Sequence, residues 1–161
     1  MIVELTPAER RAQEQALPRI FDGGLHVERI DWYTRLTIES GLILGGVLVI
    51  PEFIAAMIGE ASLNNRTFGD ANPDEFFGVG WMQFDTGYHA STMERVHAIR
   101  RDPLHSLQYA ASTPDLTRHS RFATSFNKQR WHAWEDEIIN PDEGWNPLQA
   151  AFDAWERVSS N

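Results

Sequence analysis

Two carboxylates in this sequence have neighbours that suit them to acid–base chemistry, and the first is Glu60. A helix is predicted to begin at Pro51 in the sequence PEFIAAMIGEAS, and its run Phe53 to Ile58 is apolar on every face, which is typical of a buried helix. Glu60 follows near the carboxyl end, where the helix dipole and the apolar neighbours both disfavour a charged carboxylate. A carboxylic acid that keeps its proton near neutral pH can act as a general acid.

The second carboxylate, Asp85, ends the glycine-rich sequence FFGVGWMQFD. From the helix alone, Glu60 is more simply interpreted as a surface acid on the last turn. The presence of Asp85 favours the interpretation of Glu60 as a catalytic acid instead. A helix-borne acid, a polar loop and a strand-like segment with a second carboxylate form the arrangement that two-carboxylate glycoside cleavage requires. The loop between them carries two more candidates, Asp70 and Asp74.

The same segment holds a polar Gln83 among large apolar side chains, although an unpaired buried polar group costs about 1–3 kcal/mol. A plain core segment would therefore avoid Gln83 and Asp85. Gly78 and Gly80 are expected to let the backbone approach a ligand closely.

The sequence predicts that mostly helices hold these residues in place. Only residues 76–86 suggest strands, in a small β-hairpin. Four helices are expected with both ends: from Pro7, after the N-cap Thr6, to about Leu17; from about Glu28 to Leu44, before Gly45-Gly46; from 113 to 126; and from 131 to 139. Four more have a clear start: at Pro51, at a capping box of Ser91 and Glu94, at Asp102-Pro103, and at Asn146-Pro147. The last helix is expected to bury a face made of Leu148, Ala151, Phe152, Trp155 and Val158. The Arg and Glu residues of 4–19 are interpreted as a solvated helix face. The fold class is therefore mainly α.

Composition bounds the class of protein. With 161 residues the chain is expected to form one domain, residues 1–161, in which residues 1–25 are an N-terminal helical extension. The net charge of −9 argues against a nucleic-acid binder. The chain has no cysteine and no H-E-x-x-H spacing, so we expect no disulfide and no metal site. Its longest apolar run, residues 42–50, is far shorter than the roughly 20 residues that span a bilayer, so no membrane insertion is expected.

A combination of motifs points to a known family. Glu60, with Ser62 two residues on, precedes the sequence GVGWMQFD and then Tyr88-His89. This combination resembles the goose-type lysozymes and the related lytic transglycosylases. In that superfamily the catalytic Glu ends a buried helix, and a G-x-G-x-M-Q segment follows at about the spacing seen here, where Gly80 lies twenty residues after Glu60. An aspartate directly after M-Q-x, with a histidine four residues beyond it, is similar to the goose-type branch.

The resemblance covers residues 50–90 well and is weaker downstream. The sequence ATSFN is similar to the family's A-x-A-Y-N segment, with Phe126 before Asn127. The sequence RWHAW resembles a Trp-rich segment near the end of some phage lysozyme-like domains, although its Trp131 and Trp134 are at least as simply interpreted as core aromatics.

Two departures from the family pattern concern the catalytic position. The family often has Glu-Ser there, whereas this chain has Glu60-Ala61-Ser62. A second candidate, Glu39 in the sequence IESG, looks like the transglycosylase E-S-G motif. It lies 41 residues before Gly80, and the helix that precedes it is polar on one face. We therefore assign the catalytic position to Glu60.

The resemblance implies a lysozyme-like α+β fold and a monomeric muramidase that needs no cofactor. Such an enzyme hydrolyses the β-1,4 bond between N-acetylmuramic acid and N-acetylglucosamine in the glycan strands of bacterial peptidoglycan. It implies that Glu60 protonates the leaving oxygen, while an aspartate directs a water to the opposite face with inversion. The candidates for that aspartate are Asp85, Asp70 and Asp74. The residues implied for substrate binding are Ser62, Gly80, Met82, Gln83, Tyr88, His89, Phe126, Asn127 and Trp131. The resemblance also implies that Gln83 and Asp85 line a sugar-binding cleft, with Trp81 and the neighbouring aromatic rings either packed beneath it or offered to a sugar.

Two other functions stay open. A lytic transglycosylase ends the reaction by intramolecular attack and yields 1,6-anhydro products, but Asp85 favours hydrolysis because the transglycosylase branch usually lacks an acid there. A non-catalytic wall-binding or phage-tail module is disfavoured by the presence of Glu60. No signal peptide is visible, so we expect a protein that waits in the host cytoplasm until a holin releases it to the wall, as phage endolysins do, or one that is carried in the virion.

Overall fold

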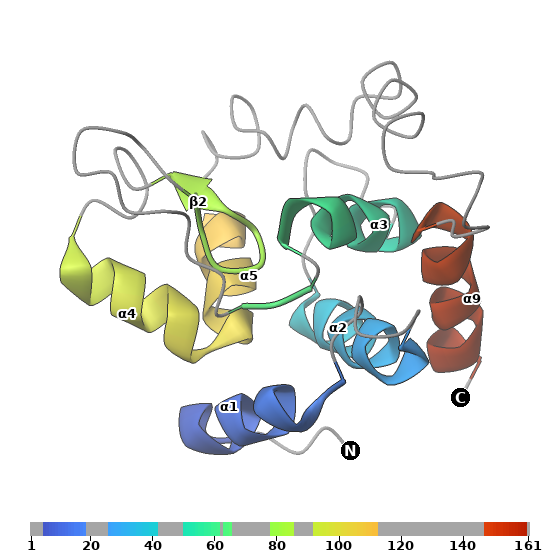
Figure 1. Ribbon diagram of the computed structural model, residues 1–161, viewed down its shortest axis with the longest axis horizontal. Coiled ribbons are helices and arrows are strands. Elements are labelled where there is room, and N and C mark those ends of the chain that lie inside the picture. Colours follow the sequence, from blue (N-terminus) through green and yellow to red (C-terminus); the bar gives the residue numbers. More distant parts are fainter. Residues whose placement is uncertain are drawn as a thin grey trace.

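The described part of the chain is mainly helical, as Figure 1 shows for this computed structural model. The structure describes residues 5–18, 26–41, 50–61, 63–65, 78–85, 92–112 and 147–160. Its helices are α1 (Pro7–Ala16), α2 (Val27–Ser40), α3 (Ile50–Ala61), α4 (Met93–Arg101), α5 (Pro103–Ser112) and α9 (Pro147–Ser159). Its strands are β1 (Gly78–Val79) and β2 (Phe84–Asp85), which pair antiparallel. For the described residues, the prediction of a mainly α fold class is confirmed.

Two helices begin at the capping signals that the sequence predicted. At the start of α1, the side-chain oxygen of Thr6 accepts the backbone N–H of Glu9 at 3.2 Å. At the start of α5, the carboxylate of Asp102 accepts the backbone N–H of Leu104 at 3.0 Å. Each bond satisfies a donor that the first turn of a helix leaves without a partner within the helix.

Two predicted helix boundaries are wrong, each because a neighbouring residue of the same kind takes the role. The fourth helix is capped by Thr92 rather than Ser91, and its side chain accepts the N–H of Arg95 at 3.1 Å. The second helix was predicted to reach Leu44 but ends at Ser40. The next residue, Gly41, adopts a left-handed conformation with φ of +63°, which ends the helix before the later glycines are reached.

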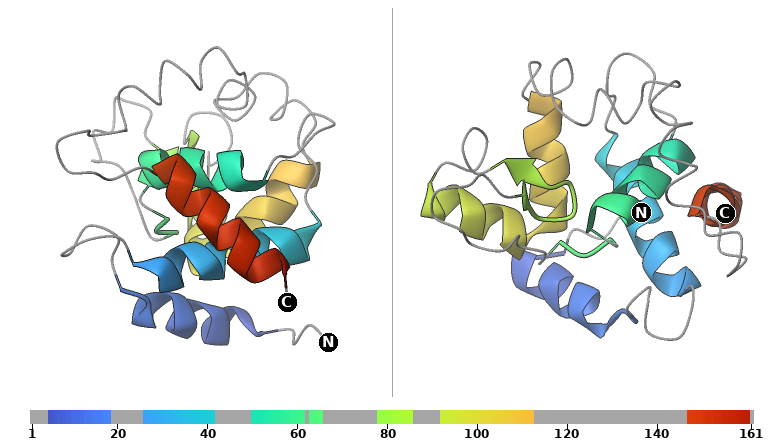
Figure 2. Two further views of the ribbon diagram at one scale, coloured as in Figure 1. Left: turned by 90° about the vertical axis from the view of Figure 1, so that its right-hand side faces the viewer. Right: turned by 45° about the horizontal axis from the view of Figure 1, so that its top comes forward.

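The core is built where α2, α3 and α9 pack against one another (Figures 1 and 2). The α3 residues at its centre are at most 1% exposed, and they are Phe53, Ile54, Ala55, Met57 and Ile58. From α9 come three alanines, Ala150, Ala151 and Ala154, none more than 5% exposed. Phe152 was predicted to share the buried face, but it is 39% exposed because the close helix contact uses the small alanine side chains instead.

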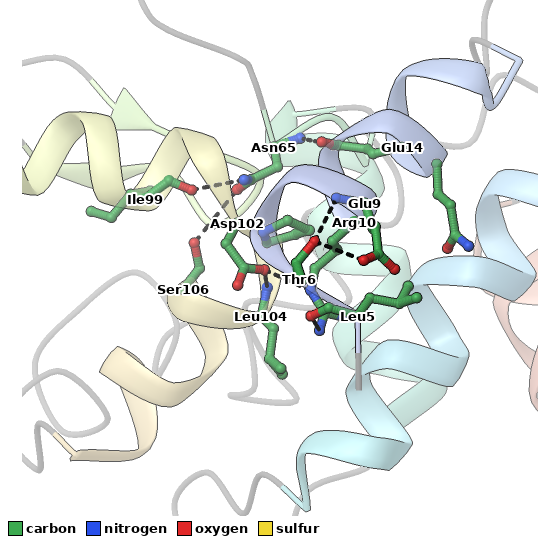
Figure 3. Close-up of polar contacts among 12 residues, drawn as sticks. Leu5, Thr6, Glu9, Arg10, Glu14, Asn65, Ile99, Asp102, Leu104 and Ser106 are labelled. Atoms are coloured by element: carbon green, nitrogen blue, oxygen red, sulfur yellow. Dashed lines mark hydrogen bonds and ion pairs between the residues drawn. The ribbon is translucent and has the colours of Figure 1, made fainter. Parts of the chain in front are cut away.

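Helix α1 docks onto the fold through charged side chains (Figure 3). Arg10 and Glu14 are 7% and 2% exposed, so the interpretation of this helix as a solvated face is wrong for both. The Arg10 guanidinium lies 2.8 Å from the carboxylate of Asp102, which precedes α5. The Glu14 carboxyl group accepts a hydrogen bond from the hydroxyl of Tyr33 and, at 2.7 Å, one from the backbone N–H of Asn65. An ion pair for Arg10 and hydrogen bonds for Glu14, both to other elements, offset the cost of burying these charged groups.

Candidate functional site

The candidate acid lies where the sequence predicted, at the end of a buried helix. Glu60 is the next-to-last residue of α3. A turn follows at Leu63, which has a left-handed backbone with φ of +50°. A left-handed conformation costs a non-glycine residue about 1–2 kcal/mol. Among the described residues only Leu63 and Gln83 combine a side chain with a positive φ, and both lie within three residues of a predicted catalytic carboxylate.

Arg29 holds the turn that contains Leu63. This α2 side chain is 4% exposed, and its guanidinium donates to the carbonyl of Leu63 at 2.6 Å. It also donates to the carbonyls of Leu17 and Pro18, at 2.9 and 2.7 Å, just after the end of α1. One buried cation therefore ties the end of α1 to the turn that follows the candidate acid, and it satisfies carbonyls that the helix end leaves open.

The second segment of the site is the antiparallel pair that the sequence predicted within residues 76–86. Gly78 pairs with Asp85, and Val79 pairs with Phe84. Between the strands, the backbone N–H of Gln83 donates to the carbonyl of Gly80 at 3.1 Å, and the side-chain amide of Gln83 donates to the same oxygen at 2.7 Å. The Gln83 carboxamide therefore stabilises its own turn, and the turn places Asp85 on β2.

The two glycines of this segment accommodate side chains of the protein itself, whereas the sequence suggested close approach by a ligand. A Cβ on Gly78 would lie 2.2 Å from the side-chain oxygen of Gln83, which folds across it. A Cβ on Gly80 would lie 2.7 Å from Ile99 and 3.1 Å from the side-chain oxygen of Asn65. Gly80 also has a φ of +79°, so both its backbone and its surroundings require glycine.

Replacing Gly80 by alanine is expected to destabilise the fold by about 2–3 kcal/mol, since the substitution adds a steric clash to the cost of a left-handed alanine. Gly41→Ala is the matched control. Gly41 is also left-handed, but nothing lies within 4 Å of an added Cβ, so it should lose only about 1 kcal/mol. Urea unfolding of the two variants measures the difference. Equal losses would mean that the contact with Ile99 and Asn65 carries no cost.

Aromatic side chains form the floor of this segment. Trp81 is fully buried, and its ring centroid lies 4.7 Å from that of Tyr33 and 5.6 Å from that of Phe53. Its indole N–H donates to the carbonyl of Pro103 at 3.1 Å. Of the two roles that the sequence left open, Trp81 therefore takes the structural one. Met82, expected to contact substrate, is 3% exposed and packs in the core.

Asn65 connects the two segments, and all of its contacts are to elements distant in sequence. Its side-chain NH₂ donates to the carbonyl of Ile99 at 2.7 Å, at the end of α4, and to that of Arg100 at 3.2 Å. Its side-chain oxygen faces the backbone N–H of Trp81 at 3.4 Å and the hydroxyl of Ser106 at 3.5 Å. Its backbone N–H donates to Glu14 at 2.7 Å. This residue, five after Glu60 and fully buried, joins the end of α3 to the turn that leads to β2.

Tyr33 makes this network sensitive to high pH. Burial, followed by the Glu14 carboxylate, raises the pKa of the Tyr33 hydroxyl well above its ordinary value of 10.0. The neutral hydroxyl therefore stabilises the fold below pH 10, and that contribution is lost as the pH rises further, because the unfolded chain releases the proton first.

We expect the free energy of unfolding to fall, between about pH 10 and pH 11, by about 1 kcal/mol more in the wild-type chain than in Tyr33→Phe. Urea unfolding at the two pH values measures this difference. Equal losses of unfolding free energy in the two proteins would show that Tyr33 has the same pKa in the folded and unfolded chain.

The remaining predicted site residues lie outside the described residues, and they are Ser62, Asp70, Asp74, Tyr88, His89, Phe126, Asn127 and Trp131. Within the described part of the chain, no group of three or more His, Asp or Glu side chains could hold a metal ion. The same part contains no helix long and apolar enough to cross a membrane.

Comparison with known proteins found no match. Neither the protein-family models, nor the curated proteins, nor the solved structures contain a significant relative of this chain. The candidate site consists of two carboxylate-bearing segments, each with a left-handed residue. Asn65 links them, because it lies four residues after the end of α3 and its side chain bonds the turn of the hairpin at Trp81.

Sequence reasoning missed the residues that hold these segments together, namely Glu14, Arg29 and Asn65. One signal was present in α1, where Arg10, Glu14 and Leu17 follow one another at i, i+4 and i+7 and so share a face. This face carries one cation, one anion and a leucine, and it can pack against the rest of the protein if each charge has an oppositely charged or hydrogen-bonding partner there. The chain supplies those partners on α2, in the turn after α3 and just before α5.

Proposed function

We propose that this chain is a peptidoglycan-degrading glycoside hydrolase, a muramidase that cleaves the β-1,4 bond between N-acetylmuramic acid and N-acetylglucosamine. Glu60 protonates the leaving oxygen. An aspartate positions the attacking water on the opposite face of the sugar, and Asp85, Asp70 and Asp74 are the candidates. Within this proposal, the lysozyme-like α+β architecture supplies a helix that ends in the acid and a hairpin that carries the second carboxylate.

The observation that carries the proposal is the joint position of the two segments. Glu60 ends a buried helix, and Asn65, five residues on, contacts the turn from which β2 delivers Asp85. Two-carboxylate hydrolysis requires a fixed separation between the acid and the base, so a rigid link between their segments suits it.

Backbone strain beside both carboxylates supports the same proposal. Left-handed non-glycine residues are uncommon, and they persist where the surrounding structure holds them and where function benefits from an unusual backbone. Leu63 follows Glu60 by three residues and is held by Arg29, whereas Gln83 precedes Asp85 by two and is held by its own side chain.

Mass spectrometry of purified sacculi after digestion tests the proposal. We expect soluble fragments with reducing ends, which are the products of hydrolysis. Fragments with 1,6-anhydro ends would assign the chain to lytic transglycosylation, which needs only the acid. No soluble fragments from a folded protein would overturn both reactions and favour a non-catalytic wall-binding module.

A further inference from the structure

A pocket of about 570 Å³ lies between α1, α2 and α5, and none of the predicted catalytic residues lines it. Its volume is within the range of small-molecule sites, about 300–1,000 Å³. Four of its side chains come from one face of α2, at i, i+3, i+4 and i+7, and they are Trp32, Arg35, Leu36 and Glu39. Glu39 belongs to the E-S-G sequence that the proposed catalytic site does not use.

Arg35 and Glu39 are exposed, and in the described part of the chain neither makes a hydrogen bond or an ion pair. Glu39 lies in the last turn of α2, where the helix dipole disfavours a carboxylate. Arg35 precedes Glu39 by four residues, and a salt bridge along a helix is weaker when the cation comes first. Both charges are therefore available to a ligand.

The other groups in the pocket add no net charge. Arg10 also lines it, but the carboxylate of Asp102, 2.8 Å away, neutralises its guanidinium. The side-chain oxygen of Gln13 accepts the indole N–H of Trp32 at 3.3 Å, which directs the Gln13 NH₂ group away from the ring as a free donor. Leu104, from α5, adds apolar surface.

We propose that this pocket binds a short peptide that has a free ammonium group and a free carboxylate. Arg35 makes a two-point contact with the carboxylate, and Glu39 binds the ammonium. Side chains four apart on a helix share one face, with Cβ atoms about 5–6 Å apart, so their flexible charged ends can reach both ends of one dipeptide, which spans at most about 7 Å. Trp32 and Leu104 contact its apolar side chain, and the Gln13 amide donates to its peptide carbonyl.

Titration calorimetry with alanyl-leucine tests this proposal, together with forms of the same dipeptide that are N-acetylated or C-amidated. We expect the unmodified dipeptide to bind, and each blocked form to bind at least about tenfold more weakly, because each block removes one of the two ion pairs. Free leucine, in which the two charges are too close together, should also bind at least about tenfold more weakly.

Arg35→Gln and Glu39→Gln should each weaken binding of the unmodified dipeptide by about tenfold or more. Both side chains are exposed, so both variants should fold, and circular dichroism checks this. The matched controls are Arg11→Gln on α1 and Glu156→Gln on α9, which are exposed residues outside the pocket and should bind within about twofold of wild type.

Equal binding of the free and blocked dipeptides would overturn the proposal. So would wild-type affinity in the Arg35 and Glu39 variants, or no detectable heat at about 10 mM dipeptide. The binding measurement does not depend on wall cleavage, so its outcome is separate from that of the proposed muramidase activity.

Discussion

Replacing Glu60 by glutamine is expected to reduce peptidoglycan cleavage by at least about 100-fold while leaving the chain folded. Glutamine has nearly the same shape as the protonated acid but cannot transfer a proton to the leaving oxygen. General-acid catalysis typically contributes about 10²–10⁴-fold, and the loss should be of that size. The measurement is the initial rate of fragment release from dye-labelled sacculi, with circular dichroism as the test of folding.

The matched control is Glu156→Gln, which removes an exposed carboxylate from α9 without touching either segment of the candidate site. Its rate should be close to that of the wild type. If the Glu60 variant keeps more than half of the wild-type rate and the control behaves as expected, Glu60 is not the acid.

Local signals made much of the helical framework predictable. A cap followed by proline, as at Thr6-Pro7 and Asp102-Pro103, acts within a few residues and needs no tertiary partner, so both starts are as predicted. Where two equivalent residues stood close together, the local signal could not choose between them. Thr92 therefore replaced Ser91 as the cap, and Gly41 ended α2 before Gly45-Gly46.

The links that hold the candidate site were not predictable, because they join residues far apart in the chain. The bond from Asn65 to Glu14 spans 51 residues, and that from Arg29 to Leu63 spans 34. Hydrophobic periodicity assigns charged residues to the surface, whereas here Glu14 and Arg29 are buried because each hydrogen-bonds to groups on other elements. The need for glycine at position 80 was equally unpredictable, because it comes from the side chain of Ile99, nineteen residues later, which leaves no room for a Cβ.

Asn65→Ala is expected to destabilise the fold by about 3–5 kcal/mol, more than any other single substitution considered for this region. The side chain is fully buried, and its removal leaves the Ile99 carbonyl, the Trp81 N–H and the Ser106 hydroxyl without that partner. Each buried polar group that loses its partner costs about 1–3 kcal/mol. Urea unfolding measures the loss.

Two further variants separate the hydrogen bonds from the volume of the side chain. Asn65→Asp keeps the volume and one oxygen but turns an acceptor towards the carbonyls of Ile99 and Arg100, so it should be about as destabilising as alanine. Gln149→Ala removes an exposed amide that bonds Asp153 at 2.9 Å, and it should change stability by less than about 0.5 kcal/mol. An aspartate variant as stable as the wild type would show that the donor bonds of Asn65 do not hold the two segments together. The link between the end of α3 and the hairpin would then have to come from the aromatic packing of Trp81 on Tyr33 and Phe53.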